Sequence, residues 1–131
     1  MRLAPILVLS VALTMPALAG QHQYVALPKS GHAVIGSVGG MKEPPVDRFI
    51  AGYQAGAKKA DPGIKLLNTY SQDWVDLAKC KEAALNQIAA GSTVEFQVAG
   101  GCGLGTLDAA KQKKVWGIGV DADQSFLGPH I

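Results

Sequence analysis

Hydrophobic and polar positions alternate between two periods from residue 33 to the end of the chain. Short apolar runs, typical of strands buried in a sheet, alternate with stretches in which apolar residues recur every three or four positions, the period of an amphipathic helix. The apolar runs are residues 33–38, 64–70, 93–99 and 115–120. Such alternation favours a parallel sheet with right-handed crossovers. We therefore predict an α/β fold with about four parallel strands and helices on both faces.

The three helical stretches carry residues that begin and end helices. Pro44 and Pro45 open the first, where the fixed φ of proline does no harm. Asp76 is placed to cap the second, and Gly91 to end it as a C′ residue. The third is shorter and follows a glycine-rich loop. The apolar positions expected to face the sheet are Val46, Phe49, Ile50, Tyr53 and Ala57, then Leu77, Cys80, Ala84, Leu85 and Ile88, then Leu104, Leu107 and Ala110.

The residues with candidate chemistry follow the strands, at the edge where ligands bind in parallel sheets. Trp74 lies between the second strand and the second helix, either as a lid over the sheet edge or as a platform for a ligand ring. Asp121 and Asp123 directly follow the fourth strand, so at least one should point into the crevice; the alternative for each is to cap the next turn.

The loop Gly100–Gly105 either lets the backbone approach a ligand closely or makes a tight turn packed against the sheet. Its glycines read G-x-G-x-G, and Asp121 lies 20 residues beyond Gly101. This departs from the dinucleotide fingerprint G-x-G-x-x-G. A dinucleotide-dependent enzyme is therefore a weakly supported alternative.

The first 32 residues differ from the rest. Residues 1–19 have the order of a secretory signal peptide: Arg2, an apolar run from Leu3 to Leu13, and the small-x-small triplet Ala17-Leu18-Ala19. A membrane span needs about 20 apolar residues, and Pro16 interrupts this run early. We expect a signal peptide over 1–19, a short linker over 20–32 and one domain over 33–131. The protein should be exported, in the periplasm or associated with the cell surface.

Composition narrows the function. The 131 residues suit one domain, and a net charge of +2 without a basic cluster argues against a nucleic-acid partner. His22, His32 and His130 have no motif partners, and hydrolase, metalloprotease, C-x-x-C and Walker motifs are missing from the sequence. We expect no enzyme, no cofactor and no metal site. Cys80 and Cys102 should lie near one sheet edge, but disulfide geometry is demanding, so we favour a buried Cys80 and a free Cys102.

Three stretches together resemble the BMP (basic membrane protein) family, the purine-nucleoside-receptor-like substrate-binding proteins of ABC transporters. They read VIGSVGGMKEPPVDRFIAGYQAGAKKADPGIKLLNTYSQDWVDLAKCKEAA, VEFQVAGGCGLGTLDAAK and IGVDADQSFLGPHI. The resemblance covers residues 33–131 with small gaps. It implies a three-layer Rossmann-like lobe of the type I periplasmic-binding-protein fold, in a family whose members have two such lobes.

The resemblance also implies a site and partners. Trp74 matches an aromatic residue that stacks on the base, usually phenylalanine, Gly100 and Gly101 match a backbone-lined wall, and Asp121 matches a carboxylate that binds ribose. The implied ligand is a purine nucleoside, delivered to an ABC permease. The residues that resemble the family match only the C-terminal lobe, so we expect a partial site. The alternative is an interaction domain without ligand binding, which self-associates through the face that the other lobe would cover.

Overall fold

A computed structural model describes residues 31–131, so the predicted signal peptide and most of the linker lie outside the described residues. The elements alternate as the hydrophobic pattern predicts. They are β1 (Val34–Gly39), α1 (Pro44–Ala60), β2 (Lys65–Tyr70), α2 (Leu77–Ala89), β3 (Val94–Val98), α3 (Gly103–Lys113), β4 (Trp116–Ile118) and a 3₁₀ helix (Ser125–Leu127).

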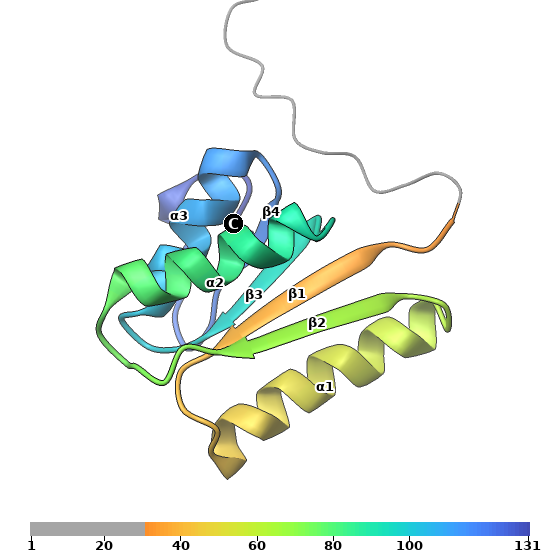
Figure 1. The fold of residues 1–131 in the computed structure, drawn as a ribbon, viewed down its shortest axis with the longest axis horizontal. Coiled ribbons are helices and arrows are strands. Elements are labelled where there is room, and N and C mark those ends of the chain that lie inside the picture. Colours follow the sequence, from red (N-terminus) through yellow and green to blue (C-terminus); the bar gives the residue numbers. More distant parts are fainter. Residues whose placement is uncertain (1–30) are drawn as a thin grey trace, which may run out of the picture.

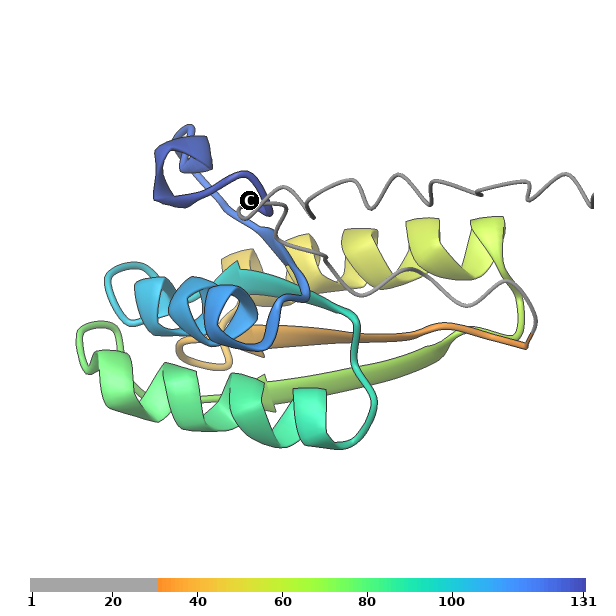
Figure 2. The same ribbon diagram turned by 90° about the horizontal axis from the view of Figure 1, so that it is seen from above.

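The four strands form one parallel sheet in the order β2-β1-β3-β4. Figure 1 shows the sheet between its helices, and the view from above in Figure 2 places α1 on one face and α2 on the other. Helix α3 packs beside α2, against β3 and β4. These are the three layers of an α/β Rossmann-like lobe, and the predicted fold class is confirmed.

Local signals set the helix ends. The Asp76 carboxylate accepts the N–H of Ala78 at 2.9 Å and caps α2. After α2, Gly91 has a φ of +101°, the left-handed conformation that favours glycine at C′. Helix α1 ends where the Asp61 N–H donates to the Ala57 carbonyl. The predicted roles of Asp76 and Gly91 are confirmed.

The two faces of the sheet have different cores. Bulky apolar side chains fill the α1 face, and small ones fill the α2 and α3 face, where α2 and α3 approach closely. A Cβ atom on Gly105 of α3 would lie 2.0 Å from the carbonyl oxygen of Leu77 in α2. Buried members of the first core are Val46, Ile50, Phe96 and Val98, and of the second Val38, Cys80, Ala83, Ala84, Ala99, Cys102 and Ala109.

Three predictions about the apolar pattern are wrong in detail. Leu77 and Leu104, expected to face the sheet, are 51% and 37% exposed, because they lie at the starts of α2 and α3, at the carboxyl edge of the sheet. The fourth strand is shorter than residues 115–120, and Trp116 and Ile118 are exposed on it, because β4 is an edge strand. Phe49 was expected to face the sheet but is 52% exposed, because it lies in the first turns of α1, beside the carboxyl edge. Within residues 31–131, no helix is long and apolar enough to cross a membrane.

Candidate functional site

A pocket of about 190 Å³ opens at the carboxyl edge of the sheet, where β1 and β3 end side by side. Strand β1 continues into α1 on one face, and β3 continues into α3 on the other, so the two connections diverge there. Such a switch point is where open parallel sheets bind ligands. The pocket is lined by Pro45, Val46, Phe49, Trp74, Val98, Gly100, Val120 and Asp121.

Trp74 forms one wall of this pocket and is held at its backbone and its ring. Its carbonyl oxygen accepts the N–H of Cys102 at 3.0 Å. Its indole lies over two glycines: a Cβ atom would be 2.6 Å from the ring at Gly40 and 3.6 Å from it at Gly100, which has a φ of +55°. A side chain at Gly40 would displace the ring. Trp74 remains 39% exposed, so an indole face supported by the backbone is open to a ligand.

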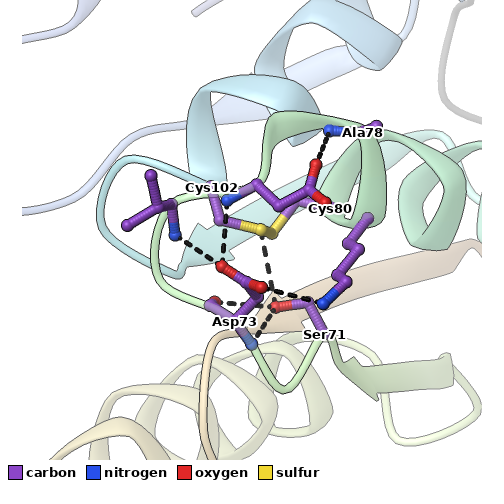
Figure 3. Close-up of polar contacts among 8 residues, drawn as sticks. Ser71, Asp73, Ala78, Cys80 and Cys102 are labelled. Carbon is purple, nitrogen blue, oxygen red and sulfur yellow. Dashed lines mark hydrogen bonds and ion pairs between the residues drawn. A yellow bond between two sulfur atoms is a disulfide. The ribbon is translucent and has the colours of Figure 1, made fainter.

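The loop that carries Trp74 is ordered by its own polar groups (Figure 3). The Asp73 carboxylate accepts the N–H groups of Val75 and Asp76, both at 2.9 Å, and the Lys79 ammonium at 2.8 Å. These bonds hold the pKa of Asp73 well below its ordinary value, the Lys79 contact most of all. The Ser71 hydroxyl donates to the Asp73 carbonyl at 3.0 Å. Trp74 therefore sits in a loop fixed on both sides.

Cys80 and Cys102 form a disulfide, with their Cα atoms 5.6 Å apart and both residues fully buried. The prediction of a free Cys102 is wrong. Cys80 lies in the first turn of α2, and Cys102 directly precedes α3. Because the starts of these two helices pack side by side, the two cysteines come within bonding range. Figure 3 shows the bond below the first turn of α2, beside Ser71 and Asp73.

The two predicted carboxylates have different surroundings. Asp121 lines the pocket, is exposed, and has a φ of +67°, a conformation that aspartate tolerates better than most residues. Asp123 does not line the pocket; its carboxylate accepts the Ser125 N–H at 2.9 Å, in the turn that leads into the 3₁₀ helix. The Ser125 hydrogen bonds hold the pKa of Asp123 below its ordinary value. The capping alternative thus holds for Asp123.

Gln124 fixes the segment that presents Asp121. Its side-chain oxygen accepts the Val120 N–H at 3.1 Å and the Gln97 amide at 2.9 Å. The Gln97 oxygen in turn accepts the Ala99 N–H at 3.1 Å. Two glutamine side chains therefore join the end of β3 to the segment after β4, beside Val98 and Val120, which line the pocket.

The glycine-rich loop contributes less open backbone than expected. Gly100 lines the pocket, whereas Gly101 does not; a Cβ atom on Gly101 would lie 3.3 Å from the Trp74 carbonyl oxygen. The N–H groups of residues 102–105 all donate to carbonyls within the protein. Helix α1 also begins with two prolines, which lack N–H groups. Neither helix start offers the row of free N–H groups that holds a pyrophosphate.

The structure therefore brings Trp74, Gly100 and Asp121 to one pocket, with Gly101 adjacent and Asp123 outside it. It adds a second aromatic residue, Phe49, together with apolar walls from the first turn of α1 and the ends of β3 and β4. Helical periodicity assigned Phe49 to the core. The double proline just before it was the available sign that the helix starts at the ligand edge.

Comparisons with known proteins agree with this geometry. The family model described as ABC transporter substrate-binding protein PnrA-like (Bmp) matches residues 19–131. The chain is 40% identical to Basic membrane protein B of Borrelia garinii, over 81% of this chain and 32% of that protein. It is also 40% identical to the ABC transporter nucleoside-binding protein BmpA of Lactococcus lactis, over 73% and 30%. The chain thus spans about a third of the length of these relatives.

Two solved structures share the fold. A solute-binding protein of an ABC transporter system from Aeropyrum pernix has a TM-score of 0.69 and 30% identity, over 74% of this chain and 29% of that one. One from Conexibacter woesei has a TM-score of 0.63 and 34% identity, over 70% and 30%. The chain belongs to the Bmp family of PnrA-like ABC transporter substrate-binding proteins.

Proposed function

We propose that this chain binds a purine nucleoside as the C-terminal-lobe part of a substrate-binding protein that serves an ABC importer. The observation that carries the proposal is the meeting of Trp74 and Asp121 in one pocket at the switch point of the sheet. The nucleoside-binding relative supports the choice of ligand class.

The lining of the pocket suits a neutral ligand with one aromatic and one hydroxylated end. The exposed face of the Trp74 indole would stack on the base, with Phe49 beside it. The Asp121 carboxylate would accept hydrogen bonds from the ribose hydroxyls. Among the described residues that line the pocket, Asp121 is the one charged side chain. A nucleoside therefore fits this lining better than a nucleotide, whose phosphate a carboxylate would repel.

Binding by this part of the site alone should be weak. Ligand pockets usually enclose about 300–1,000 Å³, whereas this one has about 190 Å³. Stacking on one aromatic ring contributes roughly 1–3 kcal/mol, and a hydrogen bond to a charged group about 1.5–3 kcal/mol. Their sum corresponds to a dissociation constant near ~1 mM. We expect millimolar affinity for inosine, guanosine or adenosine.

Residues 1–19 would direct export as a signal peptide, and the protein would work outside the cytoplasmic membrane with an ABC permease. The sequence pattern of residues 1–19 and the family support this location.

Tryptophan fluorescence tests the proposal. In the full chain with Trp116→Phe, Trp74 is the remaining indole, and inosine should quench its emission saturably with a midpoint near ~1 mM. Inosine 5′-monophosphate should bind more weakly, because Asp121 repels its phosphate. Asp121→Asn should weaken inosine binding and reduce the difference between the dissociation constants of inosine and inosine 5′-monophosphate. Absence of quenching by any of the three nucleosides, in a folded protein, would contradict the proposal.

An interaction domain without ligand is the second candidate, and a specific feature favours it. Val75 and Leu77, next to Trp74, are 75% and 51% exposed, so apolar side chains stand beside the pocket. If this edge pairs two copies, sedimentation velocity will show a dimer that dissociates in Leu77→Lys. A monomer at all concentrations would eliminate this candidate.

A further inference from the structure

We infer that the Cys80–Cys102 disulfide is a positioning element of the binding pocket, which holds Trp74 in the orientation that a ligand ring requires. The inference rests on the proposed function for its ligand, but not for its structural part. Neither cysteine lines the pocket; the disulfide would act through the loop that does.

The Trp74 loop runs from Ser71 to Asp76, between β2 and α2, and belongs to neither element. The hydrogen bonds to Asp73 order the loop internally, and the N–H groups of Ser71 and Gln72 bind its start to the carbonyls of Gly39 and Gly40 at the end of β1, at 2.8 and 2.9 Å. Attachment to the facing glycine loop comes through Cys102, whose N–H donates to the Trp74 carbonyl at 3.0 Å.

The disulfide lies at the point where the Trp74 loop is attached to the glycine loop. Cys102 carries the N–H that holds Trp74, and its sulfur also lies 3.5 Å from the Ser71 hydroxyl at the start of the loop. Through the sulfur–sulfur bond the same residue is joined to Cys80, just after the end of the loop. Cys102 thus contacts the beginning and the middle of the loop and is bonded to a residue just beyond its end. Figure 3 shows the disulfide and its contact with Ser71.

Without the disulfide, the Cys102 N–H and the Trp74 carbonyl could separate as α2 and the glycine loop move independently. Helices α2 and α3 would still pack against each other, with the Thr106 hydroxyl near the Cys80 carbonyl at 3.5 Å. The fold should therefore survive with the start of the loop still bound to Gly39 and Gly40, while the Trp74 carbonyl separates from the glycine loop and its indole shifts on Gly100. A ligand would then have to order this loop as it binds.

The test compares two full-chain variants that both lose stability but differ at the loop. Cys80→Ala with Cys102→Ala removes the bond and leaves small apolar side chains in its buried surroundings. Ile35→Ala, the matched control, opens a cavity at buried Ile35 in the first half of β1. Both variants carry Trp116→Phe and are measured at a temperature at which circular dichroism shows both folded.

Hydrogen exchange without ligand is the first readout. The backbone amide of residue 102 should exchange at least ten times faster in the alanine pair than in Ile35→Ala, and the emission of Trp74 should shift to longer wavelength. The amide of residue 116, which donates to Thr93 at the other end of the sheet, should exchange equally in both. Equal exchange at residue 102 in the two variants would overturn the inference.

Inosine binding is the second readout. The dissociation constant should rise about tenfold in the alanine pair and stay at the parent value in Ile35→Ala. Similar constants in both variants would reduce the disulfide to a stabilising element and overturn the positioning role. If the parent fails to bind inosine, the proposed function fails, and the exchange of residue 102 still decides whether the bond positions the loop. Should the alanine pair not fold, reduction of the folded full chain with excess dithiothreitol provides the same comparison.

Discussion

The two faces of the sheet are built on different principles. On the α1 face, large apolar side chains such as Ile50 and Phe96 fill the space between the helix and the sheet. On the other face, alanines, glycines and a disulfide bring α2 and α3 into close contact, and polar side chains are buried among them. The pocket lies where the two faces meet, with Phe49 from α1 on one side and Trp74 from the loop before α2 on the other.

The two faces contribute differently to the geometry of the pocket. The α2 and α3 face fixes Trp74, whose loop is bound to the glycine loop, whereas the second turn of α1 contributes the exposed ring of Phe49. We conclude that the α2 and α3 side sets the geometry of the site. Changes on that face should therefore cost more than matched changes on the α1 face.

The largest expected effect is a pH dependence of protein stability that arises from Glu95, which is buried on the α2 and α3 face. Glu95 is fully buried, with no hydrogen-bond partner of good geometry among residues 31–131. Burial raises its pKa to about 7, against a smaller opposite effect of the Ser92 hydroxyl. The folded protein therefore holds a proton that the unfolded chain releases near pH 4.5, so stability falls by about 3 kcal/mol as pH rises from 4.5 to 7.

Denaturant unfolding of Glu95→Gln checks this sign. The amide cannot ionise, so the variant should lose that slope and exceed the parent in stability at pH 8, while the two should lie close together at pH 4.5. A parent whose stability rises as much as the variant's between pH 4.5 and 7 would contradict the assignment of a buried neutral acid.

Alanine in place of glycine compares the contact between α2 and α3 with the exposed side of α1. In Gly105→Ala the new methyl would collide with the Leu77 backbone carbonyl, so we expect a loss of about 2–3 kcal/mol. Gly52→Ala in α1 meets no atom within 4 Å and should gain about 0.5–1 kcal/mol from helix propensity. Thermal unfolding measures both. Equal effects at the two positions would contradict the close approach of α3 to the Leu77 backbone.

The smallest effect compares the starts of α1 and α2. The Asp76 side chain caps α2 through the Ala78 N–H, so Asp76→Ala should cost about 1 kcal/mol. Glu43 occupies the same position before α1 without a capping hydrogen bond from its side chain, so Glu43→Ala should change stability by less than about 0.5 kcal/mol. Urea unfolding of both variants decides. Losses of the same size would mean that the Asp76 cap adds nothing.

Sequence patterns predicted most of the fold because its signals are local. Asp76 and Gly91 mark helix ends through their own hydrogen bonds and φ angles, and strand–helix alternation fixes the layers. Trp74 and Asp121 could be assigned to one edge because loops after parallel strands share it.

The remaining features depend on contacts between distant elements. The disulfide forms because the starts of α2 and α3 pack together, a fact that no spacing in the sequence contains. Periodicity placed Phe49 on the inner side of α1, but not the point at which that helix reaches the pocket. Glu95 lies within an apolar run, where no local pattern indicates that its carboxyl group is buried. The Gln87 amide donates to the Ser37 carbonyl and the Thr69 hydroxyl, so its partners lie on two different strands.

A nuclear magnetic resonance titration of the labelled full chain with inosine tests most directly the proposal that Trp74 and Asp121 act together in one nucleoside pocket. We predict shifts confined to the Trp74 indole, the Gly100 amide and residues around Asp121 and Phe49. They should saturate with one constant near ~1 mM and disappear in Trp74→Ala. Shifts at another surface, or an unchanged constant in Trp74→Ala, would contradict the account.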